Sequence, residues 1–300
     1  MRSLKLKTID GKLVHAHGGG VIKHGNYFYL YGENRSEDNY VSIYKSKDLK
    51  KWEFCNNILT KHSKEESING YKLGLTVKGH KCNIERPKIF YSESLKKFVM
   101  WAHYENGEDY LVASACVATC DTIDGDYTFH GCFKPLGNMS RDCTIFEDEG
   151  KKYFISASND NADLHIYLLT KDDLGVETLV NKLFIGKLRE APAIFKKNGI
   201  FYLLTSYCTG WFPNQCKYAT SKSLDGKFSR LLNLGNKTTS HSQPTNILQL
   251  DDSVIYLGDR WGGLGWKDYE HFDYSKSCYT YSYLTIKNNR LVFSSKKVKF

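Results

Sequence analysis

The strongest constraint on the fold is a unit that occurs five times along the chain. Each unit has a polar residue, a short apolar run, a turn, and a second run rich in aromatic and β-branched residues. The second runs begin at residues 27, 98, 153, 201 and 254, a spacing of roughly 50 residues that is typical of propeller and array repeats. Two such runs joined by a short turn predict a β-hairpin. The sequence therefore predicts five similar antiparallel sheets.

The polar residue has an equivalent place in every unit. It lies 10, 13, 11, 11 and 11 positions before the second run, at His17, Glu85, Asp142, Glu190 and Gln243. In a propeller the innermost strands converge on a central channel. We therefore expect these five side chains to face one another at the axis.

Two further short strands follow each hairpin, such as residues 41–44 and 52–54 after the first. Four antiparallel strands in each of five units predict an all-β, five-bladed β-propeller. We expect one domain over residues 1–300, with blades that start near 13, 83, 140, 188 and 241, because no Gly/Ser-rich or Pro-rich linker interrupts the repeats. The polar stretch 55–82 is expected to be a long loop near the pocket, and Gly18–Gly20 to allow close backbone packing at the axis.

Three of the five axial residues are acids, namely Glu85, Asp142 and Glu190. Carboxylates held close together repel, which raises the pKa of at least one of them. A carboxylic acid that stays protonated near neutral pH is what cleavage of a glycosidic bond requires of its general acid. The alternative is that each acid caps a turn or pairs with the Arg beside it in sequence, but the recurrence of acids at one register favours a shared site.

Several motifs, taken together and in order, resemble those of glycoside hydrolase family 43, and most closely its exo-β-1,3-galactanase branch. The motifs are Ala16–Gly20, Glu85–Lys88, Ser140–Asp142, Arg189–Pro192, Thr209–Trp211 and Gly258–Trp261. The resemblance spans nearly the whole chain. It implies a five-bladed propeller and an inverting mechanism.

Position by position, the resemblance implies that Glu190 is the general acid and that Asp142 orients it and tunes its pKa. Most of the family has an Asp as general base in blade one, where this chain has His17. In the galactanase branch, which shares that loss, a Gln at the position of Gln243 positions or activates the water, and a Glu at the position of Glu85 holds the sugar.

An amide is a poor base, so Gln243 would act as its imidic acid tautomer or chiefly as a water holder. An inverting enzyme needs about 6.5–9.5 Å between its acid and base groups to admit the water, and inner strands opposed across a channel can provide that gap. Trp211, Trp261 and Tyr104 are candidate platforms for a sugar ring, with core packing as the alternative. Further substrate contacts are expected from His17, Glu33, Asn161, Thr209 and Arg260.

The sequence thus predicts an inverting glycosidase, exo-acting on a β-1,3-galactan-like or related galactose-containing glycan. Two other functions remain open at this point. A phosphorylase on a similar propeller would need a cluster of cationic side chains at the axis, and a catalytically silent sugar-binding propeller would not need Glu190 and Asp142 together. A retaining enzyme is disfavoured because blade one lacks a nucleophile.

The composition indicates which classes of partner and cofactor to expect. The net charge is +9, but the Lys residues are scattered and no nucleic-acid-binding motif is present, so we expect a carbohydrate partner and no nucleic acid. Nine Cys, an odd number without metal-site spacing, predict unpaired thiols, and we assign no metal and no cofactor. Since neither a signal peptide nor a membrane span is visible, the default expectation is a cytoplasmic protein that does not bind a membrane, with secretion by another route as the alternative. We also expect a monomer.

Overall fold

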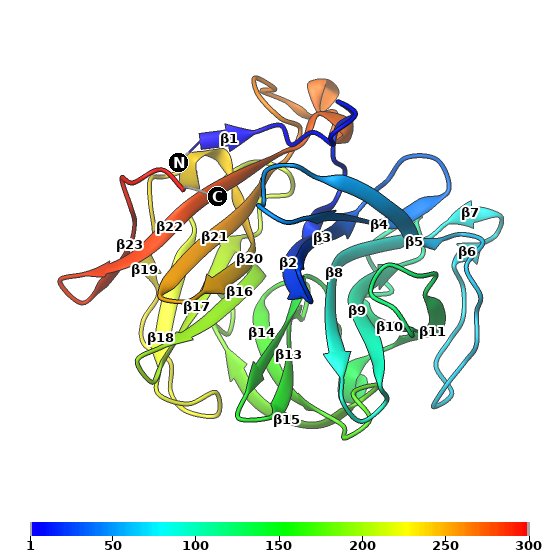
Figure 1. Ribbon diagram of the computed structural model, residues 1–300. Coiled ribbons are helices and arrows are strands. Elements are labelled where there is room, and N and C mark those ends of the chain that lie inside the picture. Colours follow the sequence, from blue (N-terminus) through cyan, green and yellow to red (C-terminus); the bar gives the residue numbers. More distant parts are fainter. Residues whose placement is uncertain (1, 299–300) are drawn as a thin grey trace.

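The computed structural model describes residues 2 to 298 and confirms a five-bladed β-propeller (Figure 1). In the first four blades, consecutive antiparallel strands run outward from the axis. Blade one contains β2 (His17–His24), β3 (Tyr27–Glu33), β4 (Asn39–Ser46) and β5 (Glu53–Thr60). Blade two contains β8 (Asn83–Ser92), β9 (Lys97–Glu105), β10 (Ser114–Cys120) and β11 (Thr128–Phe133). Blade three contains β12 (Cys143–Asp148), β13 (Lys151–Ser158), β14 (Asp163–Leu169) and β15 (Val176–Leu183). Blade four contains β16 (Arg189–Lys197), β17 (Ile200–Tyr207), β18 (Lys217–Ser221) and β19 (Leu232–Asn233).

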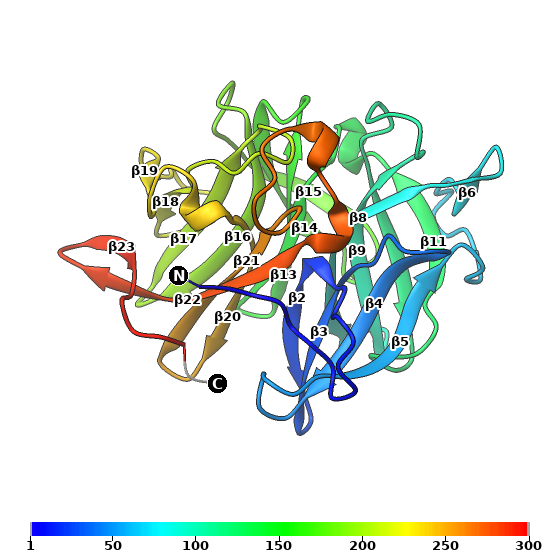
Figure 2. The ribbon, with the colours of Figure 1, turned by 90° about the horizontal axis from the view of Figure 1, so that it is seen from above.

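Blade five is completed by both ends of the chain. Its inner strands are β20 (Gln243–Leu250), β21 (Ser253–Arg260) and β22 (Cys278–Lys287). The outer edge of β22 pairs with β1 (Arg2–Leu4) along one half and with β23 (Arg290–Phe293) along the other. The strand β1 runs beside β22 in both views (Figure 2). The repeat predicts a fourth strand at the end of this blade, a place that β23 fills, but the sequence did not predict β1, which joins the start of the chain to its last blade.

The blades pack through apolar side chains that lie between neighbouring sheets. The innermost strands contact one another in the order β2, β8, β12, β16, β20 and back to β2. One hydrophobic cluster joins Ile43 of blade one to Met100 and Phe129 of blade two, and another joins Ile166 of blade three to Leu203 of blade four. Each sheet therefore buries its faces only when the ring is closed.

The innermost strands of three blades share one local irregularity. A residue with positive φ follows the polar axial residue, namely Gly18 (φ 65°), Arg86 (φ 53°) and Ala191 (φ 51°). The pairing register shifts across each of these positions, between His17 and Gly20, Glu85 and Lys88, and Glu190 and Ala193. Such a bulge bends the strand and changes the direction of the neighbouring side chains. At Gly19 a Cβ atom would collide with the Tyr31 carbonyl oxygen, so close backbone packing does require glycine there.

The stretch 55–82 differs from the expectation of a loop near the pocket. The strand β5 continues to Thr60, and the segment that follows lies along the outer edge of blade two. There the Phe129 N–H donates to the Lys64 carbonyl over 2.8 Å, and the Cys132 N–H to the Lys72 carbonyl over 2.8 Å. The segment includes the small hairpin of β6 (Thr76–Val77) and β7 (His80–Lys81). It covers an exposed strand edge and contributes no residue to the pocket described below.

Helical structure within residues 2–298 is limited to four short 3₁₀ turns, η1 (Pro135–Gly137), η2 (Thr239–His241), η3 (Tyr269–His271) and η4 (Tyr274–Lys276). Among the described residues no helix is long and apolar enough to cross a membrane. All nine Cys lie in this part of the chain and none forms a disulfide, which confirms the prediction of unpaired thiols.

Candidate active site

A pocket of about 350 Å³ lies where the innermost strands of the blades begin. It receives side chains from all five blades, and three of its lining residues are the axial acids. Its lining consists of Glu33, Arg35, Glu85, Arg86, His103, Tyr110, Arg141, Asp142, Asn161, Glu190, Cys208, Gly210, Trp211, Gln243 and Trp261. The common register of the five units therefore brings four of the five axial residues together here.

Glu190 is a buried acid of the pocket whose pKa is raised. It stands at the bulge of β16, and its side chain is almost completely buried. The Gln243 amide donates to its Oε1 over 2.8 Å, and the Asn161 amide to its Oε2 over 3.3 Å. Burial, and after it the negative charge of Asp142, raise the pKa of Glu190 to about 8. The group is therefore a carboxylic acid at neutral pH.

Asp142 lies directly before β12, on the neighbouring blade. Its Oδ2 accepts the Ala191 N–H over 3.1 Å and lies 3.2 Å from the Arg86 Nε. The first contact ties Asp142 to the residue beside Glu190, and the second supplies a buried cation. The pair of acids therefore has one fixed geometry, in which a charged Asp142 disfavours a charged Glu190.

Gln243 begins β20 and uses both ends of its amide. Its Nε2 donates to Glu190 and, over 2.9 Å, to the Ser206 hydroxyl. Its Oε1 accepts from Arg86 and, over 2.7 Å, from the Trp261 indole N–H. Both donors to Oε1 lack any acceptor capacity, so the imidic acid tautomer, which places a proton on this oxygen, is disfavoured. Gln243 also contacts the acid directly rather than facing it across the gap of about 6.5–9.5 Å expected for an acid and a base.

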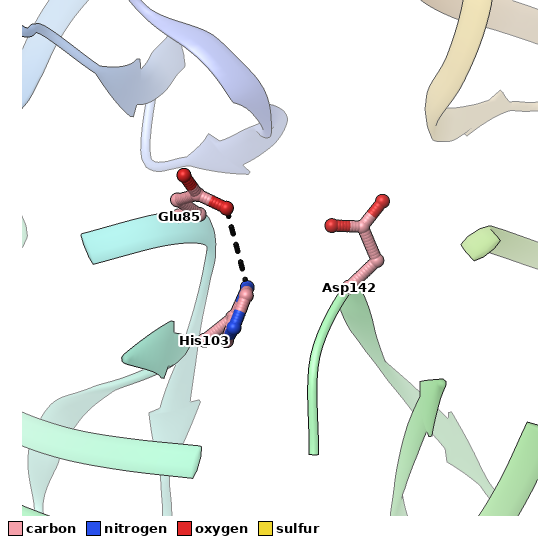
Figure 3. A group of neighbouring side chains, drawn as sticks. All are labelled: Glu85, His103 and Asp142. Carbon is pink, nitrogen blue, oxygen red and sulfur yellow. Dashed lines mark ion pairs between the residues drawn. The ribbon is translucent and has the colours of Figure 1, made fainter. Parts of the chain in front are cut away.

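Glu85 stands at the bulge of β8 and has a different environment (Figure 3). Its Oε1 accepts from Arg35 and from the Tyr110 hydroxyl, each over 2.7 Å, and its Oε2 lies 3.3 Å from the His103 Nδ1. Burial favours the neutral form, but Arg35, His103 and Tyr110 outweigh it and hold the pKa of Glu85 well below its usual range. Glu85 is therefore an ionised carboxylate.

Glu33, at the end of β3, lines the pocket and is held by hydrogen-bond donors of three residues of the protein. Its Oε2 accepts from Arg35 over 2.9 Å and from the Tyr274 hydroxyl over 3.2 Å, while its Oε1 accepts the Arg86 N–H over 3.1 Å. Burial raises the pKa of this carboxyl, although the charge of Arg35 opposes the rise. Both oxygens of Glu33 are thus engaged by the protein itself.

Among the described residues that line this pocket, Glu85, His103 and Asp142 form a cluster with atoms close enough to ligate a metal. One potential ligand atom from each lies within 4.8 Å of the others, and Figure 3 shows Asp142 opposite the other two. The chain supplies a cation to each of the two carboxylates, Arg35 to Glu85 and Arg86 to Asp142. Burial alone would favour neutral His103, yet hydrogen bonds with Glu105 and Glu85 raise its pKa to about 9. The cluster is therefore a balanced network of ion pairs.

Trp211 and Trp261 form the aromatic side of the pocket. Their rings meet edge to face with centroids 5.2 Å apart. Arg86 lies over the Trp261 ring at 5.5 Å and Arg35 over the Trp211 ring at 5.3 Å. These contacts fix the rings at the pocket wall, where a sugar face can pack against them.

Two predicted sugar contacts need correction. Tyr104 is buried in the core cluster between blades one and two, and its hydroxyl donates to the Gly74 carbonyl over 2.7 Å. His17 is completely buried, stacked on Tyr279, and its Nδ1 lies 2.9 Å from Asp259. Neither residue lines the pocket, because in each case the side chain packs between strands behind the wall.

The structure places two further predicted contact residues, Thr209 and Arg260, beside this pocket rather than in it. The Thr209 hydroxyl donates to the Phe212 carbonyl over 2.7 Å, which closes a turn. The Arg260 Nε donates to the Gly263 carbonyl over 3.0 Å, and its side chain lines a neighbouring cavity. Glu33, Asn161, Trp211 and Trp261 do line the pocket, and their contacts with a substrate stay predictions.

Sequence analysis missed the cations and the thiol of the pocket. Arg35 follows β3 and has no counterpart in the other units. Arg86 stands next to Glu85 in the sequence, which suggests a pair between these two, but it pairs with Asp142 of the next blade. His103 stands opposite Glu85 in the register of β8 and β9, so the hairpin pairing was the available signal for it. Cys208 lies beyond β17, near Asn161 and Glu190, where no sequence pattern indicated a role.

Fold and site together define a class: a five-bladed propeller with a buried, protonated acid beside ionised carboxylates in an axial pocket. The model of glycosyl hydrolases family 43 matches residues 17–249, and the chain belongs to this family.

Solved structures agree with this assignment. An exo-β-1,3-galactanase from Clostridium thermocellum is 44% identical with a TM-score of 0.85, and the match covers 96% of this chain and 63% of that one. An exo-β-1,3-galactanase variant from Phanerochaete chrysosporium, solved with β-1,3-galactotriose, is 30% identical with a TM-score of 0.84, covering 98% and 66%. A family 43 β-1,3-galactosidase solved with galactodeoxynojirimycin is 27% identical with a TM-score of 0.86, covering 100% of both chains. The chain thus spans about two thirds of the length of the two galactanases.

Proposed function

We propose that the protein is an inverting glycoside hydrolase that removes galactose from the end of a β-1,3-linked galactan or a related glycan. The similar structures named above are enzymes of β-1,3-linked galactose, and one of them was solved with β-1,3-galactotriose. A pocket of about 350 Å³ suits a terminal sugar better than the middle of a long chain, which supports exo action.

The observation that carries the proposal is the state of Glu190. It is a buried carboxyl that faces the pocket, and its pKa is raised to about 8 by burial and by Asp142. Such a group is protonated at neutral pH and can donate its proton to the leaving oxygen. Asp142 then acts through Glu190, because its charge and its bond to the Ala191 N–H fix both the pKa and the position of the acid.

For Gln243 we propose a role as the positioning residue of the acid. Its N–H holds one oxygen of Glu190, while Arg86 and Trp261 hold its own carbonyl. The alternative role, as the holder of the attacking water, makes a different prediction. Loss of a group that positions the acid should harm substrates with poor leaving groups most, whereas loss of a water holder should slow all substrates alike and be rescued by azide.

Glu85 is proposed to hold hydroxyl groups of the sugar. It is ionised, and its partner Tyr110 also lines the pocket. Because the Tyr110 hydroxyl donates its proton to Glu85, both groups offer oxygen acceptors to the hydroxyl protons of a sugar. Asn161, Trp211 and Trp261 supply further polar and aromatic contacts at the same pocket.

The test is hydrolysis of β-1,3-galactobiose, with β-1,4- and β-1,6-galactobiose as matched substrates, followed by NMR of the released sugar. We expect the β-1,3-linked substrate to be cleaved best and α-galactose to appear first. A β-configured first product would contradict inversion, and failure to cleave any galactobiose would contradict the substrate.

The phosphorylase alternative lacks support from the charges of the pocket. Arg35, Arg86 and Arg141 line it, but each lies in an ion pair with a carboxylate, so phosphate would have to displace these acids. Turnover that depends on phosphate and yields galactose 1-phosphate would nevertheless establish it. A silent sugar-binding propeller has no need of the raised pKa of Glu190, and it would bind galactobiose without cleaving it.

A further inference from the structure

A second cavity, of about 270 Å³, lies beside the active-site pocket. Gly210, Trp211, Gln243 and Trp261 line both spaces, so the two spaces adjoin along these residues. The rest of the cavity is built from the turn after β17, the η2 turn and the start of the loop that links β21 to β22. That loop, drawn in orange, projects beyond the ends of the strands (Figure 1).

The charged groups that line this cavity are mainly basic. Arg260 and Lys267 are cations that line the cavity. His241 lines it too, and burial, followed by the charge of Arg260, lowers its pKa, which favours the neutral imidazole. Asp259 is the one acid among the described lining residues, and it is completely buried. Its oxygens accept from the Gly18 N–H over 2.9 Å and from Thr245, and contact the His17 ring. Asp259 therefore faces the protein, and the cavity presents positive charge.

The walls of the second cavity are aromatic. Phe212 and Trp266 pack with ring centroids 4.8 Å apart, and the Trp266 indole N–H donates to the Trp261 carbonyl over 2.8 Å. Trp211 lies on the side that this cavity shares with the active-site pocket. Fixed aromatic faces with a few polar groups at the edge are typical of a site for a small ligand, and sugar rings pack on such faces.

The position of the cavity relative to the acid indicates which part of a substrate reaches it. Gln243 bonds Glu190 on one side and borders the cavity on the other. A general acid protonates the oxygen of the leaving group, so the leaving sugar emerges beside Glu190. The second cavity adjoins the active-site pocket along Gln243, Trp211 and Trp261, and is therefore a space that the leaving part of a substrate can reach.

We propose that this cavity binds a uronic acid unit attached to the leaving sugar, with Arg260, Lys267 and His241 recognising its carboxylate. The inference rests on the proposed function, because it assigns the leaving side of the same reaction. It makes the protein selective for acidic glycans, in which the aromatic walls hold the ring and the basic edge holds the charge.

The experiment compares two substrates that differ only in charge. One is β-1,3-galactobiose with a glucuronic acid on its leaving galactose, and the other is the methyl ester of the same compound. We expect a higher kcat/KM for the acid, and we expect the acid-to-ester ratio to fall about tenfold in Lys267→Glu. The ratio should also fall with added salt, because the contact is exposed to solvent.

The matched control is Lys222→Glu, which makes the same charge change at an exposed position outside both cavities. It should leave the ratio as in the wild type. An equal kcat/KM for acid and ester in the wild type would overturn the inference while leaving the proposed function intact.

If neither substrate is cleaved, the proposed function fails and binding decides the inference separately. Calorimetry with the same acid and ester then measures recognition without catalysis. Tighter binding of the acid that is lost in Lys267→Glu would support the basic cavity, and equal binding of acid and ester would overturn it.

Discussion

Glu85 and Glu190 are the same residue type at the same place in two blades, yet they are in opposite states. Each stands one residue before a positive-φ residue at the bulge of an innermost strand. Their exposed fractions, 7% and 8%, are nearly equal. Nevertheless the pKa of Glu85 is lowered, while that of Glu190 is raised to about 8.

The difference comes from the neighbours that the adjacent strands supply. Glu85 has a guanidinium, an imidazolium and a phenol within hydrogen-bonding or ion-pairing distance. Glu190 has two amides and a second acid. Equal burial therefore leads to different charge states. For Glu85 the nearby positive charges outweigh the effect of burial and lower the pKa, whereas for Glu190 the negative charge of Asp142 adds to the effect of burial and raises it. In this pocket burial alone does not identify the acid.

The largest effect is expected from removal of the acid itself. Glu190→Gln keeps the shape but cannot donate a proton, so kcat/KM for β-1,3-galactobiose should fall by about 10²–10⁴-fold. An aryl galactoside with a good leaving group needs less protonation and should lose much less. Glu177→Gln, at an exposed site on β15, serves as the control. Equal losses for both substrates would remove Glu190 from the role of acid.

The next effect tests what keeps Glu85 ionised. Arg35→Gln leaves two buried carboxyls, Glu33 and Glu85, without their shared cation, which should lower the free energy of unfolding by about 3 kcal/mol at pH 7. Because the folded pKa of Glu85 lies below its ordinary value of 4.5, the stabilisation from the pair is present above that pH and is lost below it. Denaturant titrations should therefore show the two proteins converging in acid.

The control for that experiment is Lys96→Gln, which breaks an exposed pair with Glu93 and should have no measurable effect. A loss in Arg35→Gln that stays the same from pH 7 down to about pH 2 would show that packing, rather than charge, is what Arg35 contributes.

A smaller effect should follow when the charge beside Glu190 is removed. A general acid works only while protonated, so kcat/KM should decline as the pH rises through about 8. Asp142→Asn removes the repelling charge and should move this decline to lower pH by about one unit. The pH profile of each protein measures the shift, and thermal unfolding checks that the variant is folded. A decline that stays near pH 8 would assign it to another group.

The smallest effect concerns the thiol beside the acid. A hydrogen bond from Cys208 favours the charged form of Glu190, so Cys208→Ala should move the alkaline decline upward by about half a pH unit. Cys55→Ala, at another half-buried thiol far from the pocket, should leave the profile unchanged. A downward shift in Cys208→Ala would mean that the thiol stabilises the protonated acid instead.

Much of the fold was predictable because hairpin chemistry is local. Apolar runs, turns and their spacing specify each sheet, and their number and order specify the propeller. The axial register was predictable for the same reason, since equivalent residues of similar hairpins occupy equivalent places. The first strand was not, because β1 pairs with residues 279–281, and a three-residue strand carries no periodic signal of its own.

The candidate site shows most clearly which features follow from the sequence and which follow only from the tertiary structure. From the sequence alone came the set of axial residues, among them Glu190 and Asp142, because a repeated pattern needs no knowledge of the partners. Only the tertiary structure decided that His17 is buried against Asp259 outside the pocket, that Tyr104 belongs to the core, and that Gln243 contacts Glu190. These outcomes depend on side chains that meet between blades, with partners such as Arg86 and Asp142 lying 3.2 Å apart across two sheets. Charge and burial at such contacts follow from packing between distant parts of the chain, which the local pattern of residues does not contain.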